Sequence, residues 1–148
     1  MRLIYSRRAT PSSVLLRIGQ WWGPWTHCAV IDGEHVVESL ASRGGVILSP
    51  LAEAVGRSSE YEVTDVPTPD DAAGIAWARS QVGRPYDWSG VFGLALRGRD
   101  WQRDDSWYCS ELVERALVEA GLTGDLARWR YGLCGITPCA SYFNRRGV

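Results

Sequence analysis

The chain has 148 residues, which fits a single domain over residues 1–148 with a sizeable hydrophobic core. Hydrophobic residues make up 45% of the chain and charged residues 22%, as is ordinary for a soluble globular protein. The formal net charge of −1 indicates no strongly electrostatic partner, so we expect no binding to nucleic acid.

The first third of the chain predicts a β-hairpin. The apolar run at residues 12–19 is compatible with either a helix or a strand, because its periodicity does not separate the two. Strands are expected at residues 26–31 and 35–40. Asp32 and Gly33 between them are typical of the two central residues of a tight turn, which both favour positive φ.

A short helix and a further strand are expected next. Residues 46–48 form a short apolar run. Ser49 followed by Pro50 is typical of an N-cap with proline at the first helical position, so a short helix ending at Gly56 is expected. The alternating segment 61–66 then predicts a strand.

Two longer helices are expected in the second half of the chain. The segment 68–71 is typical of a helix start, and this helix should run to about Val82 and end at Gly83. Residues 88–105 are hard to assign, with a helix over 91–96 as one option. The clearest helix is predicted at residues 110–120. Its apolar face consists of Leu112, Val113, Ala116, Leu117 and Ala120, with Gly121 as the C-cap.

The chain shows no sign of membrane insertion or export. No apolar run approaches the ~20 residues that a transmembrane helix needs. Residues 1–13 lack the pattern of a signal peptide. We therefore expect a cytoplasmic protein, while delivery by a phage particle or another signal-independent route stays open.

The four cysteines are Cys28, Cys109, Cys134 and Cys139, and without a signal peptide they are expected as thiols rather than disulfides. Cys134 and Cys139 are separated by four residues, and the chain has only two histidines. This is a poor match to a zinc site, so we expect no metal and no cofactor.

Cys109 lies at the start of the helix predicted at 110–120. A thiolate there is stabilised by unpaired backbone N–H groups and the positive end of the helix dipole, which lower its pKa. The same N–H groups can receive the oxyanion that forms when sulfur attacks a carbonyl. Position alone, however, more often indicates a small buried hydrophobe.

His27 and Glu38 form a candidate base and orienting acid. If residues 32 and 33 form the loop, the hairpin register places His27 directly opposite Glu38, on the same face of the sheet. Glu38 would then hold the imidazole and stabilise its charged form. The alternative is an ordinary cross-strand pair. His35 is expected as a solvated residue beside the turn, and Cys28 as part of the core.

These residues together resemble the circularly permuted NlpC/P60 superfamily of papain-like cysteine hydrolases, in which the histidine strand precedes the cysteine helix. The central motif is Trp107-Tyr108-Cys109-Ser110-Glu111-Leu112-Val113. The other matching segments occur in family order over roughly residues 14–138, at residues 25–31, 36–39, 45–46, 83–87 and 136–138.

The resemblance implies an α+β fold, in which a cysteine-bearing helix packs on a small antiparallel sheet. It also implies Cys109 as nucleophile, His27 as base and Glu38 as the third polar residue, a position that varies across the superfamily. Tyr86 and Tyr108 are candidate helpers for the oxyanion, with core or groove-lining roles as the alternative.

The first functional hypothesis is an amidase or peptidase, acting on peptide or acyl substrates such as cell-wall peptides through an acyl-enzyme. A lipid-directed thiol acyltransferase or lipase is the second, in which the tryptophan-rich segment 21–25 forms an apolar lip; core packing is the alternative for that segment. The third is a non-catalytic binding module, structural or phage-associated, with the same fold.

Overall fold

The structure is a computed structural model that describes residues 1–8, 24–89 and 105–122. The predictions for segments 12–19 and 91–96 lie outside the described residues, as do Cys134, Cys139 and the motif segment 136–138.

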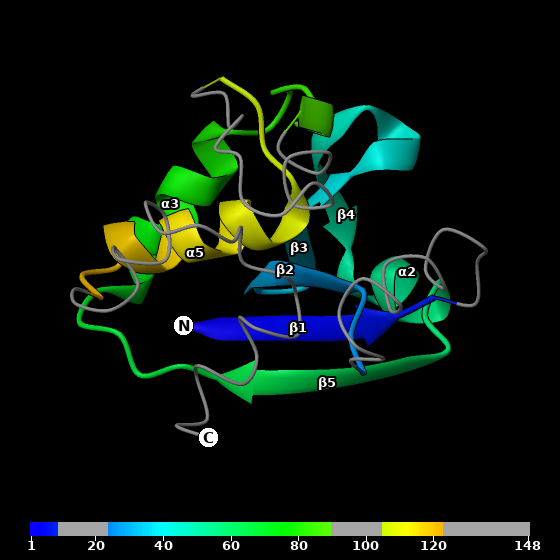
Figure 1. The fold of residues 1–148 in the computed structure, drawn as a ribbon. Helices are drawn as coiled ribbons and strands as arrows, with labels where there is room; N and C mark the ends of the chain where they lie inside the picture. Colours follow the sequence, from blue (N-terminus) through cyan, green and yellow to red (C-terminus); the bar gives the residue numbers. More distant parts are fainter. Residues whose placement is uncertain (9–23, 90–104, 123–148) are drawn as a thin grey trace.

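A five-stranded antiparallel sheet forms the centre of the fold, with the strand order β4-β3-β2-β1-β5 (Figure 1). The three inner strands are apolar on both faces, because helices cover both sides of the sheet. The strands are β1 (Arg2–Arg7), β2 (His27–Asp32), β3 (His35–Leu40), β4 (Gly45–Pro50) and β5 (Glu60–Asp65).

Helices α3 (Asp71–Ser80) and α5 (Cys109–Glu119) pack against each other and cover one face of the sheet (Figure 1). Alternate strand residues such as Tyr5, Val30 and Val37 point into this layer, against the apolar face of α5. The short helix α2 (Leu51–Gly56) covers the other face. A single 3-10 turn, η1 (Ala41–Arg43), connects β3 to β4.

The α+β class expected from the sequence is therefore confirmed. The predicted apolar face of the last helix is also confirmed, since Leu112, Val113, Ala116, Leu117 and Ala120 are all fully buried. Asp70 caps α3 by accepting a hydrogen bond from the Ala73 N–H at 3.0 Å. No helix in the described part of the chain is long and apolar enough to cross a membrane.

The predicted hairpin loop is wrong by one position. Asp32 pairs with His35, so the two loop residues are Gly33 and Glu34, and Gly33 takes the positive φ of +59°. Asp32 stays in β2, where its carboxylate accepts from Arg79 of α3. The register accordingly slips by two residues from the predicted one. A slip of two leaves every side chain on its expected face.

The expected Ser49 N-cap is also wrong. Ser49 and Pro50 still belong to β4, where Ser49 pairs with Val36, and α2 begins at Leu51. Pro50 takes the cap position, and no side chain caps the helix. The Leu51 N–H instead donates to the carbonyl of Glu34 at 2.8 Å, so the hairpin loop satisfies the first turn.

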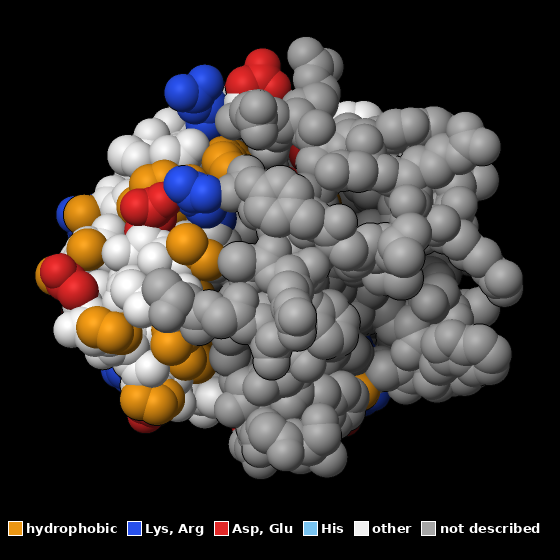
Figure 2. Space-filling view, turned by 60° about the vertical axis from the view of Figure 1, so that its left-hand side comes forward, with side chains coloured by type: hydrophobic (Ala, Val, Ile, Leu, Met, Phe, Trp, Pro, Cys, Tyr) orange, Lys and Arg blue, Asp and Glu red, His pale blue; other side chains and the backbone are white. Residues whose placement is uncertain are grey.

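Figure 2 shows the surface from the side of the molecule that is on the left in Figure 1. On its described part, hydrophobic side chains are interspersed with acidic and basic ones. This mixed surface agrees with the near-zero net charge of the chain.

Candidate active site

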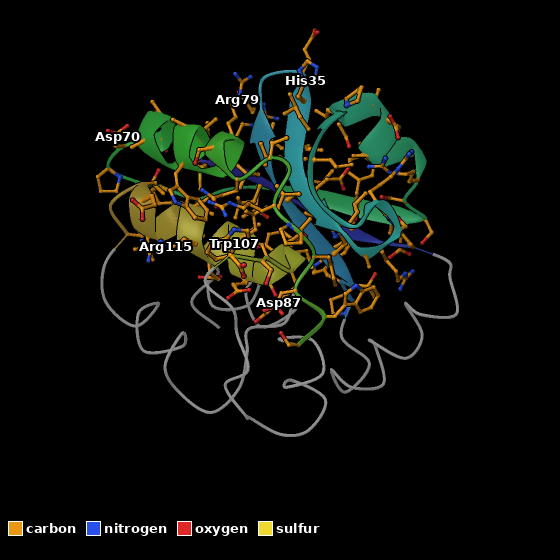
Figure 3. All side chains as sticks on the ribbon, turned by 90° about the horizontal axis from the view of Figure 1, so that it is seen from above. His35, Asp70, Arg79, Asp87, Trp107 and Arg115 are labelled. Atoms are coloured by element: carbon orange, nitrogen blue, oxygen red, sulfur yellow. The ribbon has the colours of Figure 1, made fainter. Side chains whose placement is uncertain are left out.

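The three predicted site residues come from three elements. His27 is the first residue of β2, Glu38 lies within β3, and Cys109 is the first residue of α5. In the view from above (Figure 3), Trp107 and Asp87 lie beside the start of α5, whereas His35 lies at the opposite end of the sheet. His35 is exposed, as expected, and takes no part in the site.

His27 and Glu38 are in direct contact, although the register differs from the predicted one. Continuing the observed register places Ala29 rather than His27 opposite Glu38. The two side chains still share a face, so they meet as diagonal neighbours, with His27 Nε2 2.9 Å from Glu38 Oε2.

The His27 side chain also hydrogen-bonds to the thiol of Cys109. Burial alone would lower the pKa of His27, but the hydrogen bonds to Cys109 and Glu38 and their negative charges raise it to about 9. The imidazole thus joins the thiol to the carboxylate. The three residues that the sequence predicted for the site are brought together.

The pKa of Cys109 lies well below its usual range. A hydrogen bond from the Cys28 side chain is the main cause, burial opposes it, and the hydrogen bond and charge of His27 lower the pKa further. A low pKa of the thiol beside a high pKa of the imidazole favours a thiolate–imidazolium pair at neutral pH.

Cys28 is a contact of the site that the sequence did not reveal. It was expected in the core, and it is fully buried there, on the face of β2 that α5 covers. Its side chain and its backbone both hydrogen-bond to Cys109. Strand alternation could have suggested this contact, because the residue next to His27 must point towards the cysteine helix.

Glu38 is fully buried, yet its carboxylate has several partners. Burial would raise the pKa of Glu38, but the hydrogen bond and charge of His27, the hydrogen bond of Ser49 and the charge of Arg57 lower it to about 2. A second guanidinium, that of Arg8, lies 3.7 Å from Oε2. Glu38 is therefore ionised at any pH near neutrality.

The segment before Cys109 is held in place by hydrogen bonds to the backbone of Trp107. The Trp107 N–H donates to Pro85 O at 3.1 Å, and the Trp107 carbonyl accepts from the Ser39 hydroxyl at 2.5 Å. Residues 84–86 are bonded in turn to the start of β4, with the Val46 N–H donating to Arg84 O at 2.9 Å. These bonds fix the start of α5 against β3 and β4.

Gly45 makes this close approach feasible. A Cβ added there would lie 2.0 Å from the Arg84 carbonyl oxygen, a distance that no side chain can adopt. Residues 83–87 are one of the segments whose sequence resembles the NlpC/P60 superfamily. In the structure, this segment positions the start of α5.

Tyr86 lies close enough to the thiol for charge to act between them. Burial and the negative charge of Cys109 raise the pKa of Tyr86, so its phenol stays protonated and can donate a hydrogen bond. Tyr108 is buried at the N-cap of α5 and belongs to the packed interior.

The tryptophan-rich segment 21–25 is described only from Pro24 onwards. Trp25 is 8% exposed and packs in the core with α5, so this residue forms no apolar lip. Trp88 is the exposed tryptophan of the described chain, at 54%, and its ring lies 5.0 Å from that of Tyr86.

Comparison with known proteins identifies the fold but no family. No protein-family model matches the chain, and neither does any curated protein. A solved structure that is similar is titled "Crystal structure of metalloprotein yiiX from Escherichia coli O157:H7, DUF1105". It matches with a TM-score of 0.67 and 19% identity, over 95% of this chain and 89% of that one. At this identity the likeness concerns the fold alone.

The similar protein is called a metalloprotein in its title. Within residues 1–8, 24–89 and 105–122, no group of three or more histidine, cysteine, aspartate or glutamate side chains is arranged so that it could hold a metal ion.

Proposed function

We propose that the chain is a cysteine hydrolase with a permuted papain-like fold of the NlpC/P60 type, acting on amide bonds of peptide substrates such as cell-wall peptides. The observation that carries the proposal is the position of His27, which joins the Glu38 carboxylate at 2.9 Å to the Cys109 thiol. This is the arrangement of nucleophile, base and orienting acid that acyl transfer requires.

In the proposed reaction, the Cys109 thiolate attacks the carbonyl carbon and forms a tetrahedral oxyanion. The backbone N–H at the start of α5 and the protonated hydroxyl of Tyr86 are the candidate donors to that oxygen. The His27 imidazolium then gives its proton to the leaving amine as the C–N bond breaks, which leaves a thioester on Cys109.

Water completes the cycle. His27, now neutral, takes a proton from water, and the resulting hydroxide attacks the thioester carbonyl. The acid product leaves, and the thiolate and imidazolium are restored. Throughout, Glu38 stays ionised and stabilises the imidazolium, because its carboxylate is held by His27, Ser49 and Arg57.

The test compares the full chain with Cys109→Ala and His27→Ala on peptidoglycan fragments, small acyl amides and acyl esters. We expect amide turnover by the unaltered chain and a loss of about 10³-fold or more in both variants. His35→Ala is the matched histidine control and should retain full activity, since His35 lies at the other end of the sheet.

Equal turnover by the unaltered chain and Cys109→Ala would contradict the assignment of the nucleophile. Turnover of esters or vesicle lipids without amides would favour the lipid-directed alternative. A Cys109 pKa near the free value of ~8.5, with no turnover at all, would favour a non-catalytic binding module.

A further inference from the structure

Arg57 links the candidate site to helix α2. It directly follows Gly56, the last residue of α2, and is the C-cap of that helix. Its guanidinium makes two contacts with carboxylates: Nη1 donates to Glu53 Oε1 at 2.5 Å, and Nη2 donates to Glu38 Oε1. The Arg57 side chain is 23% exposed, so it reaches from the surface to a carboxylate that is fully buried.

The two oxygens of Glu38 are divided between two partners. Oε1 accepts from Arg57, while Oε2 contacts His27 Nε2. A carboxylate held at both oxygens cannot rotate, so the oxygen that faces His27 keeps its direction. A buried carboxylate without a cation would gain a proton, and it would then no longer stabilise a charged imidazole.

We propose that Arg57 is a positioning residue of the site: its guanidinium holds the Glu38 carboxylate ionised and oriented, and thereby holds His27 charged beside the Cys109 sulfur. The role of Arg57 in catalysis rests on the proposed function. Its effect on the reactivity of the Cys109 thiol does not. Arg57 touches neither the thiol nor any substrate position, and it acts through Glu38.

The other groups around Glu38 leave this role to Arg57. Ser49 of β4 supplies a neutral hydrogen bond. Arg8, which follows β1, is 3.7 Å from Oε2, the oxygen that His27 already occupies. Arg57 alone among the described cations donates a hydrogen bond to Oε1.

The groups around the thiol determine in which direction the pKa of Cys109 should change when Arg57 is replaced. Cys109 faces His27 and Cys28 of β2, and its negative charge also acts on the Tyr86 hydroxyl and on the Arg8 guanidinium. Neutralising Glu38 weakens the imidazolium and so raises the pKa of Cys109, whereas the contacts with Cys28 are unchanged.

The chain offers a matched control. Arg43 lies 4.0 Å from the same Glu53 oxygen that binds Arg57, and it is 62% exposed. Arg43→Met therefore removes an arginine from the same carboxylate of α2 but leaves Glu38 untouched. If the loss of a positive charge near α2 were enough, the alkylation profile of Cys109 would shift in both variants. If the position of Glu38 matters, the profile shifts only in Arg57→Met.

The experiment measures the rate of iodoacetamide alkylation of Cys109 against pH, by peptide mapping, in the full chain, Arg57→Met, Arg57→Lys and Arg43→Met. We expect the Arg57→Met profile to move to higher pH by about one unit, so that alkylation on the rising, low-pH part of the profile falls about tenfold. Arg57→Lys restores the charge without the planar fork and should shift less. Arg43→Met should match the unaltered chain.

Thermal unfolding by circular dichroism accompanies each profile. An unshifted profile in folded Arg57→Met would overturn the inference, even if its melting temperature falls, because a purely structural role lowers stability alone. If Arg57→Met does not fold, Arg57→Lys decides: a profile identical to that of the unaltered chain would overturn the inference. This experiment measures alkylation and not hydrolysis. A failure of the proposed hydrolase activity would therefore leave the role of Arg57 intact, and an unshifted alkylation profile would leave the hydrolase proposal intact.

Discussion

His27 lies between a thiol and a carboxylate, and the charge of its imidazole depends on both. Its pKa is raised to about 9, above the 6.5 of a free histidine, while the pKa of Cys109 is lowered. The imidazole is therefore protonated below about pH 9, and the thiol is ionised above its own depressed pKa. The reactive ion pair exists between those two limits.

This window predicts the pH dependence of the site. Alkylation of Cys109 by iodoacetamide should already be rapid near pH 6, since an ordinary thiol of pKa ~8.5 is almost fully protonated there. Amide hydrolysis should fall as the pH rises through about 9, because neutral His27 has no proton for the leaving amine.

Peptide mapping and a pH–rate profile check these two limits. Cys28 is the internal control for alkylation: it is fully buried and should stay unmodified under conditions that label Cys109 completely. A single alkylation transition near pH 8.5, or hydrolysis that keeps rising above pH 9, would contradict the ion pair.

The site residues named from the sequence are those that carry local signals. Cys109 precedes an apolar-faced helix, and His27 and Glu38 lie on one hairpin, so each could be read within a short window. Arg57 and Arg8 could not, because their contacts with Glu38 bring together segments that share no periodicity or turn. Such contacts depend on how separate elements pack, which no local pattern encodes.

At the scale of elements, the helices and most strands could be predicted from the sequence, but the loops and element boundaries could not. The hairpin prediction put His27 and Glu38 on one face and missed the loop by one position, because Gly33 satisfies a positive φ as either central residue. Strand β1 was not predicted at all. Its residues Leu3, Ile4 and Tyr5 are buried on both faces, so the alternation that marks a half-exposed strand is missing.

The contact between α3 and α5 depends on Gly74. A Cβ on Gly74 would lie 2.5 Å from the Ala116 carbonyl oxygen and 2.8 Å from Ala120 Cβ. We expect Gly74→Ala to lower the free energy of unfolding by about 1–3 kcal/mol, as overpacking does, in spite of the higher helix propensity of alanine.

Gly56→Ala is the matched control, since Gly56 ends α2 and an added Cβ there has nothing within 4 Å. That variant should be neutral or stabilised by up to about 1 kcal/mol. Chemical unfolding of both variants measures the difference. Equal stabilities for the two would show that α3 can move away from α5 without loss.

At the scale of the whole molecule, the site exists only where distant parts of the chain meet. The sheet order β4-β3-β2-β1-β5 places the N-terminal strand next to β2, so that the charged end of β1 reaches Glu38. Helix α5 packs on the face of the sheet opposite to α2. Its first residue, Cys109, lies at the end of the sheet where β2 begins. The thiol, its base and the carboxylate thus come from α5, β2 and β3.

The hydrogen bonds that join the Trp107 backbone to Pro85 and to the Ser39 hydroxyl have a consequence for the order of folding. His27 and Glu38 are 11 residues apart and can meet in a hairpin, a step of ~1–10 μs, whereas Cys109 must wait for the slower closure of long loops. In refolding experiments with iodoacetamide pulses near pH 6, we expect Cys109 labelling to appear in the last kinetic phase, after the circular dichroism signal of the sheet. Early labelling would contradict this order. A chain that is still being synthesised, or has been cut short, thus carries an ordinary thiol, and the reactive form of Cys109 is confined to molecules that have finished folding.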